Sequence, residues 1–138
     1  MSNELQRANK ILQRINELAS ISEDEGCITR TFGTKAFIEG RDKVEQWMKE
    51  AGLQTKANAK TFVIASHIDT IINAGKFDGP MGVLMGLDLV EQIIQSKTEL
   101  PFHIELIGFS DEEGCRFHTT YLGSKVVAGS FDQATLHP

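Results

Sequence analysis

The chain has little of several features that mark large classes of protein. Its 138 residues include only two cysteines, Cys27 and Cys115, which form neither a CxxC motif nor a disulfide framework. No apolar run approaches the roughly 18 residues of a membrane span, and Met1 to Glu4 do not resemble the start of a secretory leader. These absences predict a reduced, cytoplasmic protein that does not enter a membrane.

Positive charge is also scarce. The chain has 14 Lys and Arg against 19 Asp and Glu, a formal net charge of −5, and no block in which basic and aromatic residues alternate. Proteins that follow a phosphate backbone carry such blocks, so nucleic acid is not an expected partner. No repeat or low-complexity tract interrupts the sequence, and its length suits one domain over residues 1–138.

Apolar residues at helical spacing predict helices over residues 4–19 and 34–51. In the first helix, the stripe expected to face inward consists of Leu5, Ala8, Ile11, Leu12, Ile15 and Leu18. Thr34 can cap the second helix, Gly40 weakens its middle, and Gly52 follows it in the position that favours glycine. The inward residues of the second helix are Phe37, Val44, Trp47 and Met48.

A strand, a helix and a strand form the next predicted unit. Residues 61–66 are too apolar and β-branched for a surface strand, so they should form a strand covered on both faces. Pro80 opens a helix that ends near Ser96, and residues 102–109 form a second strand. The inward face of this helix is Val83, Leu84, Leu87, Val90, Ile93 and Ile94. This order predicts a βαβ unit with parallel strands, and a short helix should follow over residues 121–128.

Three polar clusters lie beside these elements. His67 and Asp69 follow the first strand, Asp78 precedes the third helix, and Glu112 and Glu113 follow the second strand. Because ligands bind beyond the carboxyl ends of parallel strands, clusters far apart in the sequence should meet there. Imidazole and carboxylate groups are what a metal-dependent hydrolase needs to hold cations beside a general base.

Each cluster also has a simpler explanation. His67 can be a surface histidine near a turn, although a continuing strand would point Asp69 the same way and let it orient the imidazole. Asp78 can be a helix N-cap, but its two oxygens could also bridge two cations about 3.5 to 4 Å apart. The acidic run at Glu112 and Glu113 can be a solvated loop, whereas adjacent carboxylates let one bind metal while the other transfers protons.

Other titratable residues are weaker candidates. His103 begins the second strand, nine residues and roughly 30 Å from Glu112, so it is expected to be structural. Cys115 and His118 have a three-residue spacing that metal ligands sometimes use, which is weak evidence by itself. His137 lies beside the end of the chain.

Two segments, ASHIDTIINAGKFDGPMGVLMGLDLV and IELIGFSDEEGCRFHTTYLGSKVVAGS, resemble the N-terminal catalytic portion of the binuclear metal amidohydrolase family. This family includes allantoate amidohydrolases, N-carbamoyl-L-amino-acid hydrolases and β-ureidopropionases, within the aminoacylase and carboxypeptidase superfamily. With the upstream stretches GCITRTF and VEQWMKEAGL, the resemblance covers nearly the whole chain. It implies an α/β fold of three layers, α/β/α, with a mostly parallel sheet.

The resemblance also implies a role for each residue of the clusters. His67 would ligate one metal, Glu113 would ligate the other, and Asp78 would bridge both. Glu112 would be the general base and Asp69 would support His67. The implied reaction is hydrolysis of a ureido or amide C–N bond of a small molecule, with Mn²⁺, Zn²⁺, Co²⁺ or Ni²⁺ as the divalent cofactor.

The chain departs from the family pattern in two respects. Family members are much longer and draw further histidine ligands, lid residues and a substrate-carboxylate clamp from sequence beyond this portion. Residues 54–60 are too few for the β-hairpin with an Asp-x-x-Gly-Asn signature that is usual there. Each metal would have two protein ligands, fewer than the three of a catalytic zinc, so we expect weak or single-metal occupancy and little activity from these residues alone.

The missing elements also bear on partners. Apolar faces of the sheet left open predict self-association or a complementing polypeptide. A different class of function is a non-catalytic binding or assembly module that keeps the fold and a residual metal site. A metal-free structural domain with a coincidental acidic loop is a third alternative.

Overall fold

The computed structural model describes residues 3–52 and 61–136. Its elements, in chain order, are α1 (Asn3–Ala19), α2 (Lys35–Glu50), β1 (Thr61–His67), α3 (Pro80–Gln95), β2 (His103–Phe109), α4 (Leu122–Val127) and a final short 3-10 helix, η1 (Gln133–Leu136). The hairpin expected to be absent from residues 54–60 lies outside the described residues. None of the described helices is both long and apolar enough to cross a lipid bilayer.

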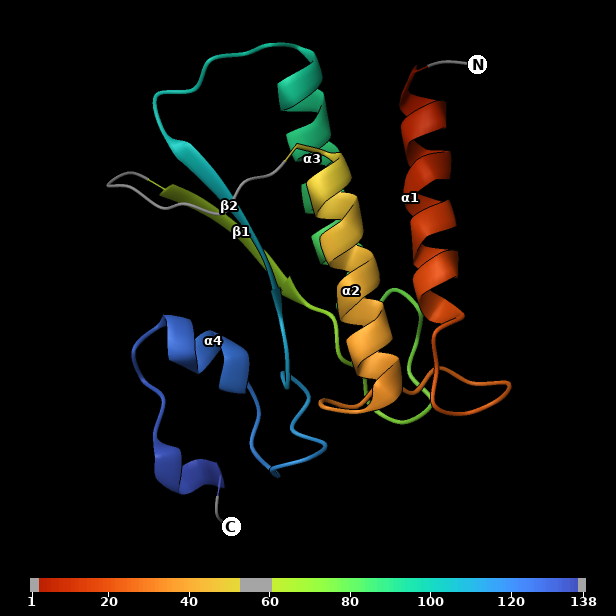
Figure 1. Cartoon of the computed structure of the whole chain (residues 1–138), viewed down its shortest axis with the longest axis vertical. Coiled ribbons are helices and arrows are strands. Elements are labelled where there is room, and N and C mark those ends of the chain that lie inside the picture. Colours follow the sequence, from red (N-terminus) through yellow and green to blue (C-terminus); the bar gives the residue numbers. More distant parts are fainter. Residues whose placement is uncertain (1–2, 53–60, 137–138) are drawn as a thin grey trace.

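The two described strands form a parallel pair connected by α3. Their register runs from Thr61 opposite His103 to His67 opposite Phe109, which confirms the predicted βαβ unit and the α/β class. Figure 1 shows both strands ending on the same side of the molecule, where α4 and η1 also lie. The residues that follow the two strands are therefore neighbours in space.

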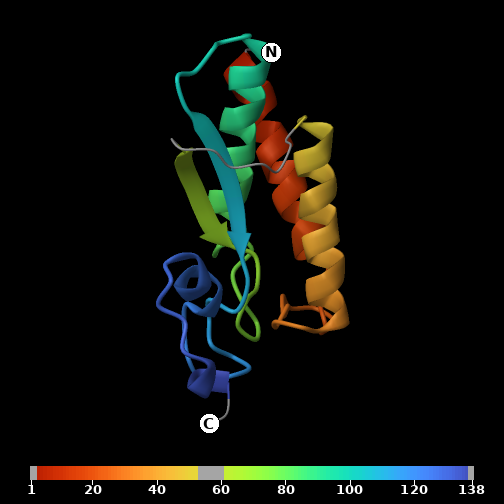
Figure 2. The same ribbon diagram turned by 60° about the vertical axis from the view of Figure 1, so that its left-hand side comes forward.

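Helices α1, α2 and α3 all lie on one side of this sheet, as Figures 1 and 2 show. Small residues bring α3 close to the strands: a Cβ added at Gly86 would lie 2.8 Å from side-chain carbons of Ile64 and Leu106. The prediction that residues 61–66 are covered on both faces is wrong. Val63 alternates with Ile64, points to the opposite face, and is 48% exposed because the three long helices pack on the other side.

The core lies between the helices and the inner side of the sheet. It consists of Ile15, Leu18, Phe37, Val44, Trp47, Ile68, Val83, Leu84 and Leu87. Only the second half of α1 contributes to it, and the predicted inward residues Leu5 and Leu12 are 50% and 44% exposed. On α3, Ile94 is also exposed. The helices are where the sequence predicts them, but their buried stripes are shorter.

Charged pairs take the place of apolar contacts between the first half of α1 and α3. Arg7 lies 2.6 Å from Asp88, and Glu91 accepts from both Lys10 at 2.5 Å and Arg14 at 2.8 Å. The two acidic side chains are only 6% and 8% exposed. Apolar periodicity could not reveal this interface because it assigns charged residues to the solvent side.

The ends of α2 match their sequence signals. The Thr34 hydroxyl accepts a hydrogen bond from the backbone N–H of Phe37 at 3.2 Å, and Gly52 has a positive φ of 82° after the helix. Packing explains the glycine at position 40, and the sequence did not reveal this. A Cβ added there would lie 2.7 Å from Cδ of the buried Arg30, so glycine makes room for that side chain.

Candidate metal site

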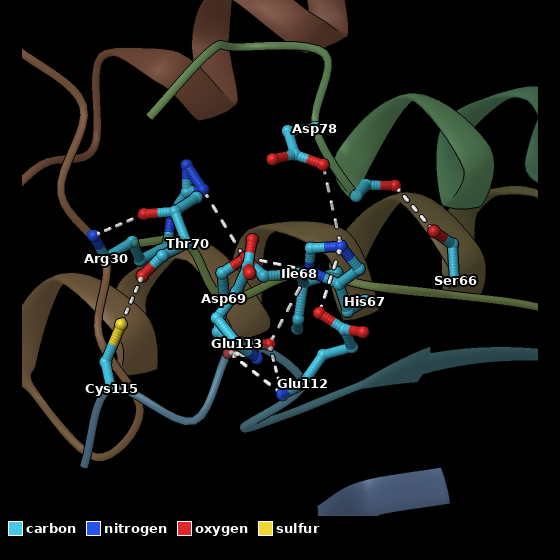
Figure 3. Close-up of polar contacts among 11 residues, drawn as sticks. Arg30, Ser66, His67, Ile68, Asp69, Thr70, Asp78, Glu112, Glu113 and Cys115 are labelled. Carbon is cyan, nitrogen blue, oxygen red and sulfur yellow. Dashed lines mark hydrogen bonds and ion pairs between the residues drawn. The ribbon is translucent and has the colours of Figure 1, made fainter. Parts of the chain in front are cut away.

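The candidate site lies just beyond the carboxyl ends of β1 and β2. β1 ends at His67, and the backbone N–H of Ile68 still donates to the carbonyl of Phe109 at 3.0 Å. That bond holds the loop after β1 against the loop after β2, which carries Glu112 and Glu113. The predicted meeting of these clusters therefore takes place in the folded chain (Figure 3).

His67 stands at the centre of the cluster. Its Nδ1 lies 3.0 Å from the backbone carbonyl oxygen of Asp69, a contact that fixes the ring when Nδ1 carries the proton. Nε2 then faces two carboxylates, at 3.9 Å from Asp78 and 3.8 Å from Glu112. A neutral imidazole in this tautomer presents its Nε2 lone pair to a cation.

Asp69 lies beside His67, and its predicted role in supporting the imidazole stays a prediction. Its carboxylate is 3.8 Å from Nδ1 of His67 but accepts hydrogen bonds from the backbone N–H of Glu112, at 3.0 and 3.3 Å, and of Glu113, at 3.4 Å. The strand ends at His67, so strand alternation is not what brings the two side chains within 3.8 Å of each other. Asp69 is 2% exposed, and it fixes the position of the carboxylate loop.

Glu112 and Glu113 complete a group that fits a metal ion. Within residues 3–52 and 61–136, the only set of three potential ligand residues is His67, Glu112 and Glu113, whose ligand atoms all lie within 4.8 Å of one another. Burial raises the pKa of Glu113, and the charges of Asp78, Glu112 and Asp69 raise it further against the opposing effect of His67. Carboxylates crowded in this way favour a cation between them.

Asp78 lies at the open side of the cluster. The prediction that it can be an N-cap is wrong, because the N-cap residue of α3 is Gly79 and no side chain donates or accepts a capping hydrogen bond there. The Asp78 side chain is 59% exposed and faces Nε2 of His67. It is near the three-residue group without belonging to it, so its predicted bridging role stays a prediction.

Two residues that sequence reasoning missed tie β1 to the start of α3. Ser66 donates from its hydroxyl to the carbonyl of Gly79 at 2.9 Å. Gly79 has a φ of 82°, and a Cβ added to it would lie 2.5 Å from the imidazole of His67. The Gly-Pro pair that signals the helix start was therefore also a signal for close approach to the histidine.

Asp111 is a further buried carboxylate beside the cluster. It is 2% exposed, adopts a φ of 51°, and neither of its oxygens has a hydrogen-bond partner among the described residues. Burial raises its pKa, and the charge of Asp69 adds to the effect. The sequence presents Asp111 as part of an exposed acidic run, whereas its positive φ turns the loop so that Glu112 and Glu113 reach His67.

The weaker candidates lie outside this group. Cys115 is exposed, with its sulfur 4.0 Å from the carbonyl oxygen of Thr70, and neither it nor His118 joins the set of potential ligands among the described residues. His103 is at the far end of β2 and exposed. His137 lies outside the described residues.

The chain is similar to known proteins over most of its length. The profile of peptidase family M28 matches residues 50–136. Allantoate deiminase 1 of Glycine max is 35% identical over 93% of the chain, and N-carbamoyl-L-amino acid amidohydrolase of Geobacillus stearothermophilus is 31% identical over 94%. The crystal structure of a hydantoinase/carbamoylase family amidase from Burkholderia ambifaria superposes with a TM-score of 0.83 at 28% identity, over 91% of the chain.

The matched proteins are longer than this chain. It covers 30% of the Glycine max protein, 36% of the Geobacillus protein and 35% of the Burkholderia chain. The resemblance to allantoate and N-carbamoyl amino-acid amidohydrolases is confirmed, and the similarity extends over nearly all of the residues present.

Proposed function

Since the chain belongs to peptidase family M28, we propose that it forms the metal-binding part of a hydrolase that cleaves a linear amide or ureido C–N bond. The observation that carries the proposal is the convergence of His67, Glu112 and Glu113 at the carboxyl ends of two parallel strands. Metal ligands beside a carboxylate able to transfer protons are what metal-assisted hydrolysis requires.

The proposed ligands are His67, Asp78 and Glu113. Imidazole and carboxylate donors suit Mn²⁺, Zn²⁺, Co²⁺ and Ni²⁺, and two ions are expected in the complete site of the family. A divalent cation held there supplies Lewis acidity toward the scissile carbonyl and lowers the pKa of water. Nε2 of His67 and the crowded carboxylate of Glu113 are the groups best placed to hold it.

Glu112 is the proposed general base. Its carboxylate is partly exposed and lies 3.8 Å from Nε2 of His67, so it borders the ligand group and is open to solvent. It would accept a proton from the attacking water and return it to the leaving nitrogen, a role that typically accelerates a reaction by about 10² to 10⁴-fold. Asp69 accepts a hydrogen bond from the backbone N–H of Glu112 and so fixes the backbone that carries this carboxylate.

The proposed substrates are small ureido or amide compounds. The names of the relatives, allantoate deiminase and N-carbamoyl-L-amino acid amidohydrolase, make allantoate and N-carbamoyl amino acids the first compounds to test. A homo-oligomer or a complementing polypeptide is the proposed protein partner, because one face of the sheet is exposed in the described residues. Cytoplasmic location stays a prediction.

Metal content and turnover test the proposal directly. The 138-residue chain is dialysed against Mn²⁺ or Zn²⁺, freed of excess ion, and measured for metal per chain and for hydrolysis of allantoate and an N-carbamoyl amino acid. The variant Glu112→Gln should keep its metal and lose turnover, whereas His67→Ala should lose its metal. Glu39→Gln, a substitution on the exposed side of α2, should change neither.

Each outcome separates two functions. Bound metal with turnover that Glu112→Gln abolishes supports a hydrolase. Bound metal without turnover overturns catalysis by these residues alone and favours the non-catalytic module that retains a residual metal site. Absence of bound metal at saturating ion concentration overturns the assignment of His67, Asp78 and Glu113 as ligands.

A further inference from the structure

Arg30 is a buried arginine close to the candidate site that the proposed reaction does not use. It lies in the segment between α1 and α2 and is 1% exposed. Its guanidinium donates to the carbonyl of Leu18, at the end of α1, at 3.0 Å and to the carbonyl of Ile68, just after β1, at 3.4 Å. One side chain thus joins the helical layer to the loop that follows His67.

The backbone of Arg30 holds the same loop. Its N–H donates to the hydroxyl of Thr70 at 2.8 Å, and the N–H of Thr70 donates to its carbonyl at 3.1 Å. Figure 3 shows Arg30 beside Thr70, with Asp69 between Thr70 and the carboxylate loop. Ile68 and Thr70, the residues on either side of Asp69, are therefore both hydrogen-bonded to Arg30.

The fold makes space for this side chain at some cost. Gly40 is buried in the middle of α2, and a Cβ added there would lie 2.7 Å from Cδ and 2.9 Å from Nε of Arg30. Glycine inside a helix is unfavourable relative to alanine. Nε of Arg30 also has no hydrogen-bond partner among the described residues. A side chain that served only to fill the core would be better replaced by an apolar one.

The charge of Arg30 is complementary to that of the site. Burial lowers its pKa, and the one charge that opposes this effect is Asp69. Asp69 in turn accepts the backbone N–H groups of Glu112 and Glu113. The buried cation is attracted to a buried carboxylate, and that carboxylate accepts hydrogen bonds from the two amides of the loop that carries the candidate ligands.

We propose that Arg30 is a positioning residue: it fixes residues 68–70 so that Asp69 holds the Glu112–Glu113 loop beside His67 before any cation binds. The part of this inference that concerns cation affinity depends on the proposed function. The part that concerns the loop does not, because it describes the metal-free chain. Arg30 touches neither the cation nor the substrate in this role.

Arg14 provides a matched control. It is also a buried arginine, with its guanidinium 5.5 Å from the ring centre of Trp47 and its Nη2 2.8 Å from Glu91. Its contacts lie between α1, α2 and α3 and include none of the candidate ligands. Arg30→Met and Arg14→Met each remove a buried charge and keep a long side chain, so both should lower the melting temperature.

Amide-resolved hydrogen exchange of the metal-free chain tests the positioning role. Arg30→Met should accelerate exchange of the Glu112 and Glu113 amides by about tenfold or more relative to wild type, whereas Arg14→Met should leave these amides within about twofold of wild type. Equal effects of the two variants on these amides would show that Arg30 acts only through global stability and would overturn the proposal.

The affinity for Co²⁺ and the visible spectrum of the bound ion supply a second readout. Partners that orient metal ligands typically contribute about 10 to 100-fold in affinity. We expect such a loss for Arg30→Met, a smaller one for Arg30→Lys, and none for Arg14→Met. An unchanged affinity and spectrum in Arg30→Met would overturn the inference. If wild type itself binds no Co²⁺, the proposed function fails and the exchange measurement alone decides the role of Arg30.

A second variant covers the case in which Arg30→Met does not fold. Gly40→Ala leaves the arginine in place but pushes its stem away from α2. The substitution favours the helix itself, so the variant should remain folded. It should nevertheless accelerate exchange at Glu112 and Glu113, and protection equal to wild type there would count against the proposal.

Discussion

At the scale of single residues, the site is built from carboxylates that repel one another. Glu113 has a raised pKa because it is partly buried near Asp78, Glu112 and Asp69. Bringing these carboxylates together is unfavourable for folding. Natural proteins contain such unfavourable arrangements chiefly at functional sites. We therefore expect the cluster to lower the stability of the fold when no cation is bound and to bind a cation.

The variant Glu113→Gln tests whether the cluster lowers the stability of the fold. In the presence of a chelator at neutral pH, it should melt at a higher temperature than wild type, because it removes one of the repelling charges. It should also lose the stabilisation by cation, which for one site reaches about 2.7 kcal/mol at a concentration 100 times Kd. Thermal melts with and without Mn²⁺ check both effects, and Glu39→Gln serves as the control.

The gain in melting temperature from Glu113→Gln should depend on pH. A carboxyl whose pKa is higher in the folded protein than in the unfolded chain destabilises the fold when ionised. Wild-type stability therefore falls as pH rises through the folded pKa and is recovered below the unfolded value of about 4.3. The difference in melting temperature should be largest at neutral pH and shrink toward pH 4, and a constant difference would contradict the repulsion.

Gly79 and Gly75 test the close approach to His67. Gly79→Ala should cost on the order of 1–3 kcal/mol in backbone strain alone, and the added Cβ would press on the imidazole. Gly75 has no neighbour within 4 Å and no positive φ, so Gly75→Ala should be near neutral. Denaturant unfolding and Mn²⁺ titration of both variants check this. Equal metal affinities would show that His67 does not need the glycine.

Residues of the site were predictable to different degrees. His67, Glu112 and Glu113 follow strands whose ends could be located by apolar runs, so their meeting could be foreseen. The contact of the Asp69 carboxylate with two backbone amides could not, because it depends on where β1 ends and how the next loop turns. Arg30 carries no local signal, since its partners lie on other elements.

At the scale of elements, apolar spacing gave the helices but not how they pack. The helix α3 begins at Pro80 as expected, while its contact with α1 depends on Asp88 and Glu91. Pairs between elements 77 to 81 residues apart leave no periodic pattern in the sequence. The continuous apolar and β-branched run of β1 indicated burial, but whether both faces are covered depends on elements elsewhere.

Glu91 is the residue on which this interface depends. Glu91→Ala would leave the buried Arg14 and the partly exposed Lys10 without their carboxylate. Removal of one partner of a buried pair typically costs about 3–5 kcal/mol. Urea unfolding should show a loss of that size. Glu39→Ala, which breaks an exposed pair with Lys35, should cost less than about 1 kcal/mol, and similar losses for both would contradict a buried network.

At the scale of the whole molecule, the sheet face opposite α3 is exposed in the described residues and favours association. Val63 is 48% exposed, and strand alternation points it away from α3, against which its neighbour Ile64 packs. In the described residues the sheet has only two strands, so each strand also has a free edge. Edges and apolar faces of this kind promote association, and the chain should self-associate as its concentration rises.

Val63→Lys locates that association. A charge on the open face should keep the chain monomeric at concentrations where light scattering of wild type shows a rising average mass. Met85→Lys is the matched control, because Met85 is 49% exposed on α3 rather than on the sheet. If Met85→Lys prevents association and Val63→Lys does not, the helix face is the contact. If wild type keeps the mass of a monomer at high concentration, the expectation is refuted. The exposed sheet face would then remain in contact with solvent without promoting association.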